Sequence, residues 1–249
     1  MSALPELAMM DSWDADANFL SESIKKLRGP LNILEAGCGR SWPLDLKGVE
    51  YRLTGIDLDG EALKSRVEQV GDLHEAIIGD LCAPGMIRTE TYDVIYSSFV
   101  LEHVAPAEQL LDNMVRGLKP GGLLLLHIPD RDSVFGWTAR RSPFGVHVAY
   151  YRLVHRYKHA GEPGHPPYPT YHAPIVSRDG IWGFCRKHGC EVLHEHGHSY
   201  YVRGKGLRPL AIRLYSIGIS VLSLGTLAWR HDNLTYVIRK NGAGVSPTG

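Results

Sequence analysis

Three carboxylates and two glycines in the first third of the chain have the spacing of a nucleoside-binding site. Glu35 lies two residues before Gly37, and Gly39 follows. Asp57 and Asp80 each stand at the end of a later apolar run. An aspartate so placed can accept hydrogen bonds from both ribose hydroxyls, and glycines let the backbone approach a ligand that a Cβ would push away. These residues indicate a site for an adenosine-containing ligand.

The elements that would position these residues alternate between strands and helices. Apolar runs predict buried strands at 31–36, 51–56, 75–79, 92–97, 123–128, 190–196 and 233–239. Helical spacing predicts helices at 11–28, 60–70, 107–118 and 177–188. Such alternation is typical of an α/β sheet whose ligand lies across the carboxyl ends of its strands.

The surroundings of the glycines distinguish between cofactors. Glu35 would repel a pyrophosphate but suits a ligand that carries an ammonium and a sulfonium. A dinucleotide fingerprint needs a third small residue where this chain has Trp42. Asp80 adds a carboxylate able to accept from an adenine amino group. The residues favour a cationic adenosine cofactor, with an NAD(P)-dependent oxidoreductase as the alternative.

Five motifs, in order, carry a family resemblance: ILEAGCG, GIDLD, IGDL, YDVIYSSFVLEHV and LKPGGLLLLHIP. Together they resemble class I S-adenosylmethionine-dependent methyltransferases of the small-molecule, type 11 (ubiquinone-methylase-like) group. The resemblance covers about residues 31–129. It implies a Rossmann-like, seven-stranded, doubly wound sheet with helices on both faces, strand order 3-2-1-4-5-7-6 and an antiparallel last strand. It also implies S-adenosyl-L-methionine as the cofactor.

The same resemblance assigns cofactor contacts by motif. It places Glu35, Gly37, Cys38 and Gly39 around the methionine moiety, Asp57 and Leu58 at the ribose and adenine, Gly79, Asp80 and Leu81 at the adenine, and Ser97 at the methionine end. The chain departs from many relatives at 41–42, where Ser-Trp replaces a small residue. We therefore expect a wider turn here.

Methyl transfer is an in-line displacement, so placement of the acceptor comes first and proton removal second. If the acceptor is a hydroxyl, His103 is the candidate catalytic base, because it follows the fourth strand at the mouth of the site. Its alternative role is to begin the next segment structurally. We expect O-methylation of a small molecule, such as a sugar, lipid-linked or natural-product hydroxyl.

Several other histidines compete for a role. His194, His196 and His198 alternate along a predicted strand and would share one face if that strand continues through His198. They would then resemble a metal site, but a polar outer face of an edge strand is the simpler interpretation, and we expect no metal. His127, at the end of the fifth strand, is a candidate lining residue of the acceptor pocket, as are the histidines of 130–176.

Two insertions interrupt the predicted domain, which spans 1–240 and is followed by a flexible tail at 241–249. Residues 130–176 have no clear periodicity, and we expect a lid or substrate region with one helix near 149–159. Residues 198–230 contain an apolar helical region at 209–229. It is too short for a bilayer span. This helical region could pack on the sheet, on a partner, or at a membrane interface. If it binds a membrane, a further alternative for the whole protein is a membrane-surface protein with a vestigial cofactor fold.

The overall composition limits the classes of molecule that the protein is expected to bind. The 249 residues are 44% hydrophobic, and 27 Lys and Arg balance 27 Asp and Glu. Because the chain has no excess of positive charge to attract nucleic acid, we expect it to bind a small molecule and no nucleic acid. Four cysteines at unmatched spacings suit reduced thiols, and the first residues do not resemble a secretion signal. We expect a cytoplasmic protein, with membrane association as an option.

Overall fold

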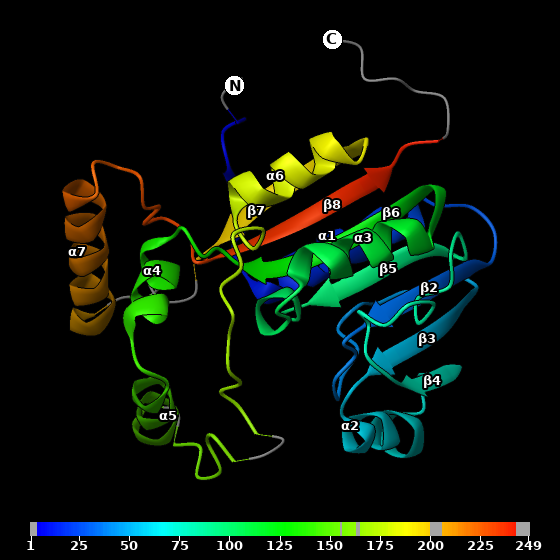
Figure 1. Cartoon of the computed structure of the whole chain (residues 1–249), viewed down its shortest axis with the longest axis horizontal. Helices are drawn as coiled ribbons and strands as arrows, with labels where there is room; N and C mark the ends of the chain where they lie inside the picture. The colour runs from blue at the N-terminus through cyan, green and yellow to red at the C-terminus, as the bar shows by residue number, and fades with distance from the viewer. Residues whose placement is uncertain (1–3, 155, 163–164, 200–205, 243–249) are drawn as a thin grey trace.

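The computed structural model describes residues 4–154, 156–162, 165–199 and 206–242, and its centre is an eight-stranded sheet (Figure 1). The strands are β1 (Ala8–Met9), β2 (Leu31–Ala36), β3 (Tyr51–Asp57), β4 (Glu75–Ile78), β5 (Tyr92–Ser98), β6 (Leu118–Pro129), β7 (Cys190–His198) and β8 (Asn233–Lys240). Their order is β1-β7-β8-β6-β5-β2-β3-β4, with β8 antiparallel to both neighbours.

This arrangement confirms the expected order of seven strands and the antiparallel last strand, and it corrects their number. The extra strand, β1, pairs parallel to β7 at one edge of the sheet. Two residues are too few to show an alternating pattern, so β1 leaves no signal in the sequence.

Helices cover both faces of the sheet. They are α1 (Trp13–Lys25), α2 (Gly60–Ser65), α3 (Ala107–Gly117), α4 (Val134–Arg141), α5 (Phe144–Leu153), α6 (Arg178–Lys187) and α7 (Leu207–Leu222), with a π-helical turn at Arg66–Val70 and a 3-10 turn at Leu101–His103. Alternate residues of β6 face opposite sides: Leu126 packs in the cluster of α3 and α6, and Leu125 in that of α1. Figure 1 shows α1 behind the sheet and α3 and α6 in front.

The first insertion contains two helices, α4 and α5, where one helix near 149–159 was predicted. Ser133 caps α4 through its hydroxyl, which accepts from Gly136 N. No side chain of α5 is buried. A helix that buries no face needs no apolar period, which is why the pattern failed to locate it.

The apolar helix of the second insertion packs on α4 and stands away from the sheet (Figure 1). Tyr215 Oη lies 3.1 Å from Thr138 Oγ1 across this contact. Apolar side chains of α7 point outward, among them Leu207, Leu210, Leu214, Val221 and Leu222. Among the residues that the structure describes, no helix is both long enough and apolar enough to span a membrane. Of the predicted tail, 243–249 lie outside the described residues.

Candidate active site

The glycine turn after β2 has the geometry that its sequence predicts. Gly37 and Gly39 have φ values of +73° and +52°, and a Cβ on Gly37 would lie 2.3 Å from Val100 Cγ2. Gly39 N donates to Asp57 Oδ2 at 2.8 Å, and Asp59 N donates to Asp57 Oδ1 at 2.9 Å. The turn and the aspartate of β3 are therefore one hydrogen-bonded unit at the carboxyl edge of the sheet.

Glu35 is buried beneath this turn and pairs with an arginine that the sequence analysis missed. Arg66, fully buried, donates to Glu35 Oε2 at 2.8 Å and to the carbonyl oxygen of Cys38 at 2.7 Å. It also forms two hydrogen bonds of 2.9 Å to Asp72. With its side chain 4% exposed, Glu35 supports the turn from below. The helical spacing from Leu63 to Arg66 was the available signal, because it places both on one buried face.

The predicted ribose and adenine residues lie together at the ends of β3 and β4: Asp57, Leu58, Gly79, Asp80 and Leu81. Gly79 N donates to the carbonyl oxygen of Asp57 at 3.0 Å. Leu58 is 73% exposed and offers an apolar surface beside the carboxylate. Asp80 Oδ1 accepts from Cys82 N at 2.8 Å, so one of its oxygens already closes a turn.

The side chains of Ser97 and Cys38 face inward. Ser97 is 2% exposed, and its hydroxyl donates to the carbonyl oxygen of Ala36 at 3.0 Å. Cys38 is buried, and burial raises the pKa of its thiol to about 12. Neither of these two predicted side chains is exposed at the edge of the sheet.

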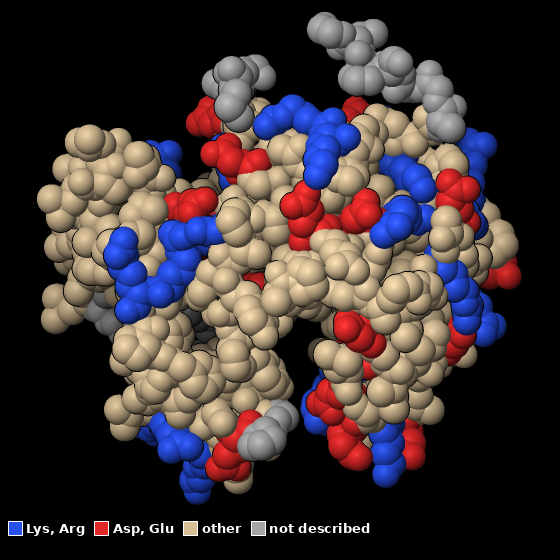
Figure 2. All heavy atoms as spheres, in the orientation of Figure 1, with Lys and Arg blue, Asp and Glu red and all other residues tan. Residues whose placement is uncertain are grey.

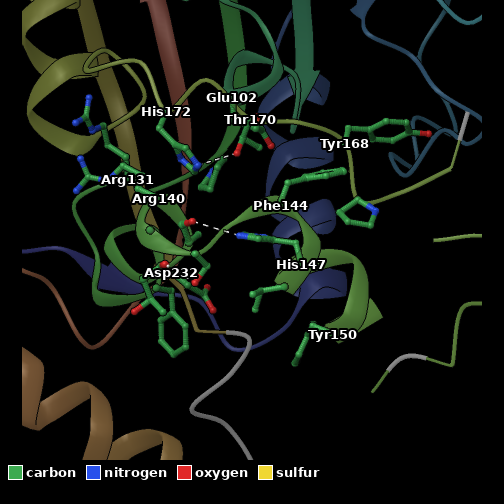
Figure 3. A pocket seen from close by; sticks show the side chains of 18 of the residues that line it. Glu102, Arg131, Arg140, Phe144, His147, Tyr150, Tyr168, Thr170, His172 and Asp232 are labelled. Atoms are coloured by element: carbon green, nitrogen blue, oxygen red, sulfur yellow. Dashed lines mark hydrogen bonds between the residues drawn. The ribbon is translucent and has the colours of Figure 1, made fainter. Parts of the chain in front are cut away.

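A cavity of about 960 Å³ opens beside this edge, between the end of β5 and the first insertion (Figure 3). Its walls include Glu102, His103, Arg131, Phe135, Arg140, Phe144, His147, Tyr150, Tyr151, Tyr168, Thr170, His172, Tyr215 and Asp232. Figure 2 also shows a hollow between the insertion and the region of α2, whose residues do not line this cavity. Most of these walls come from segments without a sequence period.

A carboxyl and an imidazole stand side by side in this cavity. Glu102 is 4% exposed, its Oε2 has no hydrogen-bond partner among the described residues, and burial raises its pKa to about 8. His103 Nδ1 lies 2.8 Å from the carbonyl oxygen of Pro169, and its Nε2 lies 3.8 Å from Glu102 Oε1. Burial lowers the pKa of His103, although the hydrogen bond to the Pro169 carbonyl partly raises it. The neutral imidazole therefore carries its proton on Nδ1 and leaves Nε2 as a proton acceptor.

The insertion reaches back to the predicted cofactor edge. Tyr171 N donates to the carbonyl oxygen of Glu102 at 2.8 Å. The ring of Tyr168 lies 5.8 Å from that of His103. Burial raises the pKa of Tyr168, and the nearby carboxylates of Asp59 and Asp57 raise it further. The segment 166–172 therefore connects the cavity to the Asp57 edge.

The remaining histidines divide between two places. His147 and His172 line the cavity, as the sequence allowed. His127 does not line it but is buried with its Nδ1 3.7 Å from Asp16 Oδ2. His155 lies outside the described residues. Strand β7 continues through His198, and His194 and His196 both pack edge-on against Phe19, so they share one face as predicted. The interpretation of this face as the polar outer face of an edge strand is wrong, because β1 lies outside β7 and His196 and His198 are buried.

Comparison with known proteins agrees with this geometry. A family model described as a methyltransferase domain matches residues 10–195, about three quarters of the chain. The ubiquinone biosynthesis O-methyltransferase of Rickettsia prowazekii is 34% identical over 136 residues, which cover 49% of this chain and 47% of that protein. The trans-aconitate 2-methyltransferase of Paracidovorax citrulli is 29% identical over 102 residues, which cover 40% of this chain and 39% of that protein. The chain spans about half the length of the curated relatives it matches, or less.

Similarity to solved structures extends over the whole fold. A SAM-dependent methyltransferase from Archaeoglobus fulgidus has a TM-score of 0.55 and 16% identity, and the match covers 92% of this chain and 95% of that chain. The strand order, the glycine turn bonded to Asp57 and the family match agree. The chain belongs to the methyltransferase-domain family, and its cofactor is S-adenosylmethionine.

Proposed function

We propose that this protein transfers a methyl group from S-adenosylmethionine to a hydroxyl of a small-molecule acceptor, with His103 as the base. The observation that carries the proposal is the position of the Glu102 and His103 pair, which lines the cavity and follows β5 at the predicted cofactor edge. A nicotinamide oxidoreductase would need a pyrophosphate site, and Trp42, packed against Tyr96, occupies the position of the small residue that such a site uses.

The residues at the carboxyl edge fit the cofactor. A Cβ on Gly37 would fill the turn, so that position accepts only a bare backbone. We assign the ribose hydroxyls to Asp57, whose carboxylate oxygens keep lone pairs beyond their bonds to Gly39 N and Asp59 N, and the adenine to the exposed apolar surface of Leu58. When bound, S-adenosylmethionine supplies an electrophilic methyl group.

His103 would take the acceptor proton through Nε2. Its Nδ1 is held by the Pro169 carbonyl, which fixes the tautomer. Its lowered pKa keeps the ring unprotonated at neutral pH, so that Nε2 can accept a proton. The insertion contributes by holding the acceptor and by excluding water from the reacting atoms.

The cavity favours an acceptor with an aromatic or lipid-like part and a polar end. Aromatic walls such as Phe144 and Tyr150 can stack on a ring or an isoprenoid chain, while Arg131, Arg140 and His172 line another part. These walls support a phenolic natural product or a lipid-linked sugar as the acceptor class. The quinone-pathway name of one relative agrees with the phenolic option.

Two measurements test the proposal. Asp57→Ala should weaken S-adenosylhomocysteine binding in calorimetry by at least about 1–3 kcal/mol, because it removes a charge-assisted acceptor of two hydroxyls. Asp45→Ala, an exposed aspartate in the loop after the turn, is the matched control and should bind normally. Binding of NADH in place of S-adenosylhomocysteine would contradict the assignment.

The pH dependence of kcat/KM tests the base. With His103 as base, activity should rise with pH through a pKa below the usual value of about 6.5. With Glu102 as base, it should rise near pH 8. His103→Gln should remove the first inflection, whereas an inflection near pH 8 in the unaltered enzyme would transfer the role to Glu102.

We also propose that the enzyme works in the cytoplasm and reaches its acceptor at a membrane surface through α7. Leu214 and Val221 are 61% and 67% exposed on this helix, a pattern that suits an interfacial helix. Replacing both with serine should reduce sedimentation with phosphatidylglycerol vesicles. Val67→Ser with Val70→Ser, at 50% and 51% exposure in the π-helical turn, is the control and should not. Equal sedimentation of both variants would argue against the contact.

A further inference from the structure

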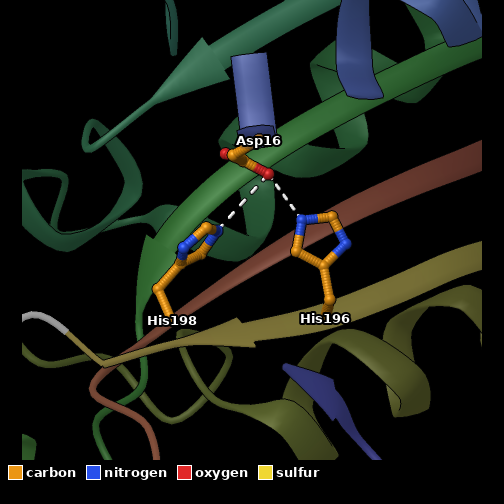
Figure 4. Close-up of side chains that lie close together, drawn as sticks. All are labelled: Asp16, His196 and His198. Atoms are coloured by element: carbon orange, nitrogen blue, oxygen red, sulfur yellow. Dashed lines mark hydrogen bonds and ion pairs between the residues drawn. The ribbon is translucent and has the colours of Figure 1, made fainter. Parts of the chain in front are cut away.

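We infer that Asp16, His196 and His198 form a binding site for a transition-metal ion, with zinc as the best fit. Asp16 Oδ1, His196 Nε2 and His198 Nε2 converge from α1 and β7, with one ligand atom per residue and all three within 4.8 Å of one another. Figure 4 shows both imidazoles turned toward the same carboxylate. This site is separate from methyl transfer and does not depend on the function proposed above.

The chain brings these residues together across the fold. His196 and His198 are two residues apart on β7 and so project from the same face of the sheet. Asp16 lies one turn into α1, which covers that face. His194 projects from the same face, with its ring 5.2 Å from that of Phe19, but its nitrogens are not among the converging ligand atoms. A carboxylate from a distant helix takes the place of the third imidazole that the sequence pattern indicated.

Burial and unusual geometry mark the cluster. Asp16, His196 and His198 are 2%, 4% and 4% exposed. Asp16 Oδ1 lies 2.5 Å from His196 Nε2 and 3.3 Å from His198 Nε2. His198 Nε2 nevertheless makes no hydrogen bond of good geometry with any described residue. The nitrogens of His196 and His198 therefore point at the same Asp16 oxygen, and that of His198 is left without a hydrogen bond. A bound metal ion between the three atoms would explain this arrangement.

The spacing is close to that of a coordinated ion. A tetrahedral zinc about 2.0–2.1 Å from each ligand separates the ligand atoms by about 3.3 Å. The His198 contact already has this length, and the His196 contact needs to lengthen by less than about 1 Å. Imidazole and carboxylate donors suit zinc, whereas calcium and magnesium prefer oxygen-only sites.

A third imidazole and an indole ring complete the enclosure. His127 Nδ1 lies 3.7 Å from Asp16 Oδ2, and its Nε2 has no hydrogen-bond partner among the described residues. Its ring lies 5.4 Å from that of His198. Trp13 stacks on His198, with ring centroids 5.0 Å apart, and packs at a tilt against His127, with centroids 4.4 Å apart, so it covers one side of the group. A site closed in this way is structural, and the ion would fasten α1 to β6 and β7.

The alternative is that no ion binds and that these residues only join α1 to the sheet by hydrogen bonds. In this hydrogen-bonded brace, Asp16 accepts from His196 and, at 3.2 Å, from Thr235 Oγ1. A brace and a metal site differ in one measurable respect, because only the metal site makes stability depend on metal concentration.

The test uses the full chain, without an affinity tag, stripped with dipicolinate. We expect one zinc per chain in calorimetry and a melting temperature that rises with free zinc. His196→Ala and His198→Ala should weaken zinc binding at least about 100-fold, since each removes a ligand. His194→Ala, on the same strand, is the matched control and should bind zinc as the unaltered chain does.

Cobalt provides a second measurement that does not rely on loss of binding. His198→Cys keeps a metal ligand, so its cobalt complex should gain a thiolate charge-transfer band that the unaltered chain lacks. Absence of stoichiometric zinc binding, or equal loss in His194→Ala, would overturn the inference. So would Asp16→Asn lowering the melting temperature while zinc has no effect on the unaltered chain, because that result identifies the brace.

Discussion

Replacing Glu102 by glutamine should stabilise the protein at alkaline pH and not at acid pH. Burial raises the pKa of Glu102 from 4.5 to about 8. Between those values the folded protein keeps a proton that the unfolded chain has lost. The stability from this group is therefore complete below pH 4.5 and is lost as pH rises through about 8. Glutamine keeps the shape and has no proton to lose.

The size of the effect follows from the shift. A shift of about 3.5 units corresponds to about 5 kcal/mol at most, and about 3 of those units fall between pH 5 and pH 9. The advantage of Glu102→Gln in free energy of unfolding should therefore grow by about 4 kcal/mol over that range.

Urea unfolding of both proteins at pH 5, 7 and 9, without cofactor, measures this difference. Glu108→Gln is the matched control, because Glu108 is exposed and pairs with Lys187 at 2.8 Å. It should show no gain at high pH. An advantage of Glu102→Gln that stays constant from pH 5 to pH 9 would refute the reasoning, since it would mean that the carboxyl does not titrate differently on folding.

Two further substitutions test the support of the glycine turn. Gly37→Ala should lower the free energy of unfolding by at least about 2 kcal/mol and weaken S-adenosylhomocysteine binding in calorimetry, because it adds a Cβ 2.3 Å from Val100 at a positive φ. Normal binding would show that the turn can relax. Arg66→Met should lower the free energy of unfolding in urea by about 3–5 kcal/mol, because Glu35 and Asp72 lose their partner. Adding Glu35→Gln should restore part of this stability. If it restores none, the loss comes from packing.

The sequence by itself determined the strands and the cofactor edge. Residues 31–36 and 51–57 form β2 and β3 because their apolar runs can be satisfied only in a buried sheet. Gly37, Gly39 and Asp57 then meet because parallel strands end at the same edge. These features are local, or they follow from the repeated strand–helix–strand connection between parallel strands, so their spacing along the chain is enough to predict them.

Only the tertiary structure decided which polar groups are buried and with whom. Asp16 meets His196 across 180 positions of sequence, and Arg66 meets Glu35 across 31. Helix α5 has no buried face. Contacts between distant segments leave no period in the chain, since a buried charge is tolerated only where another segment supplies its partner. The edge where the predicted cofactor residues meet is therefore evident from the sequence, whereas the cavity beside Glu102 and His103 and the Asp16 cluster exist only in the folded protein.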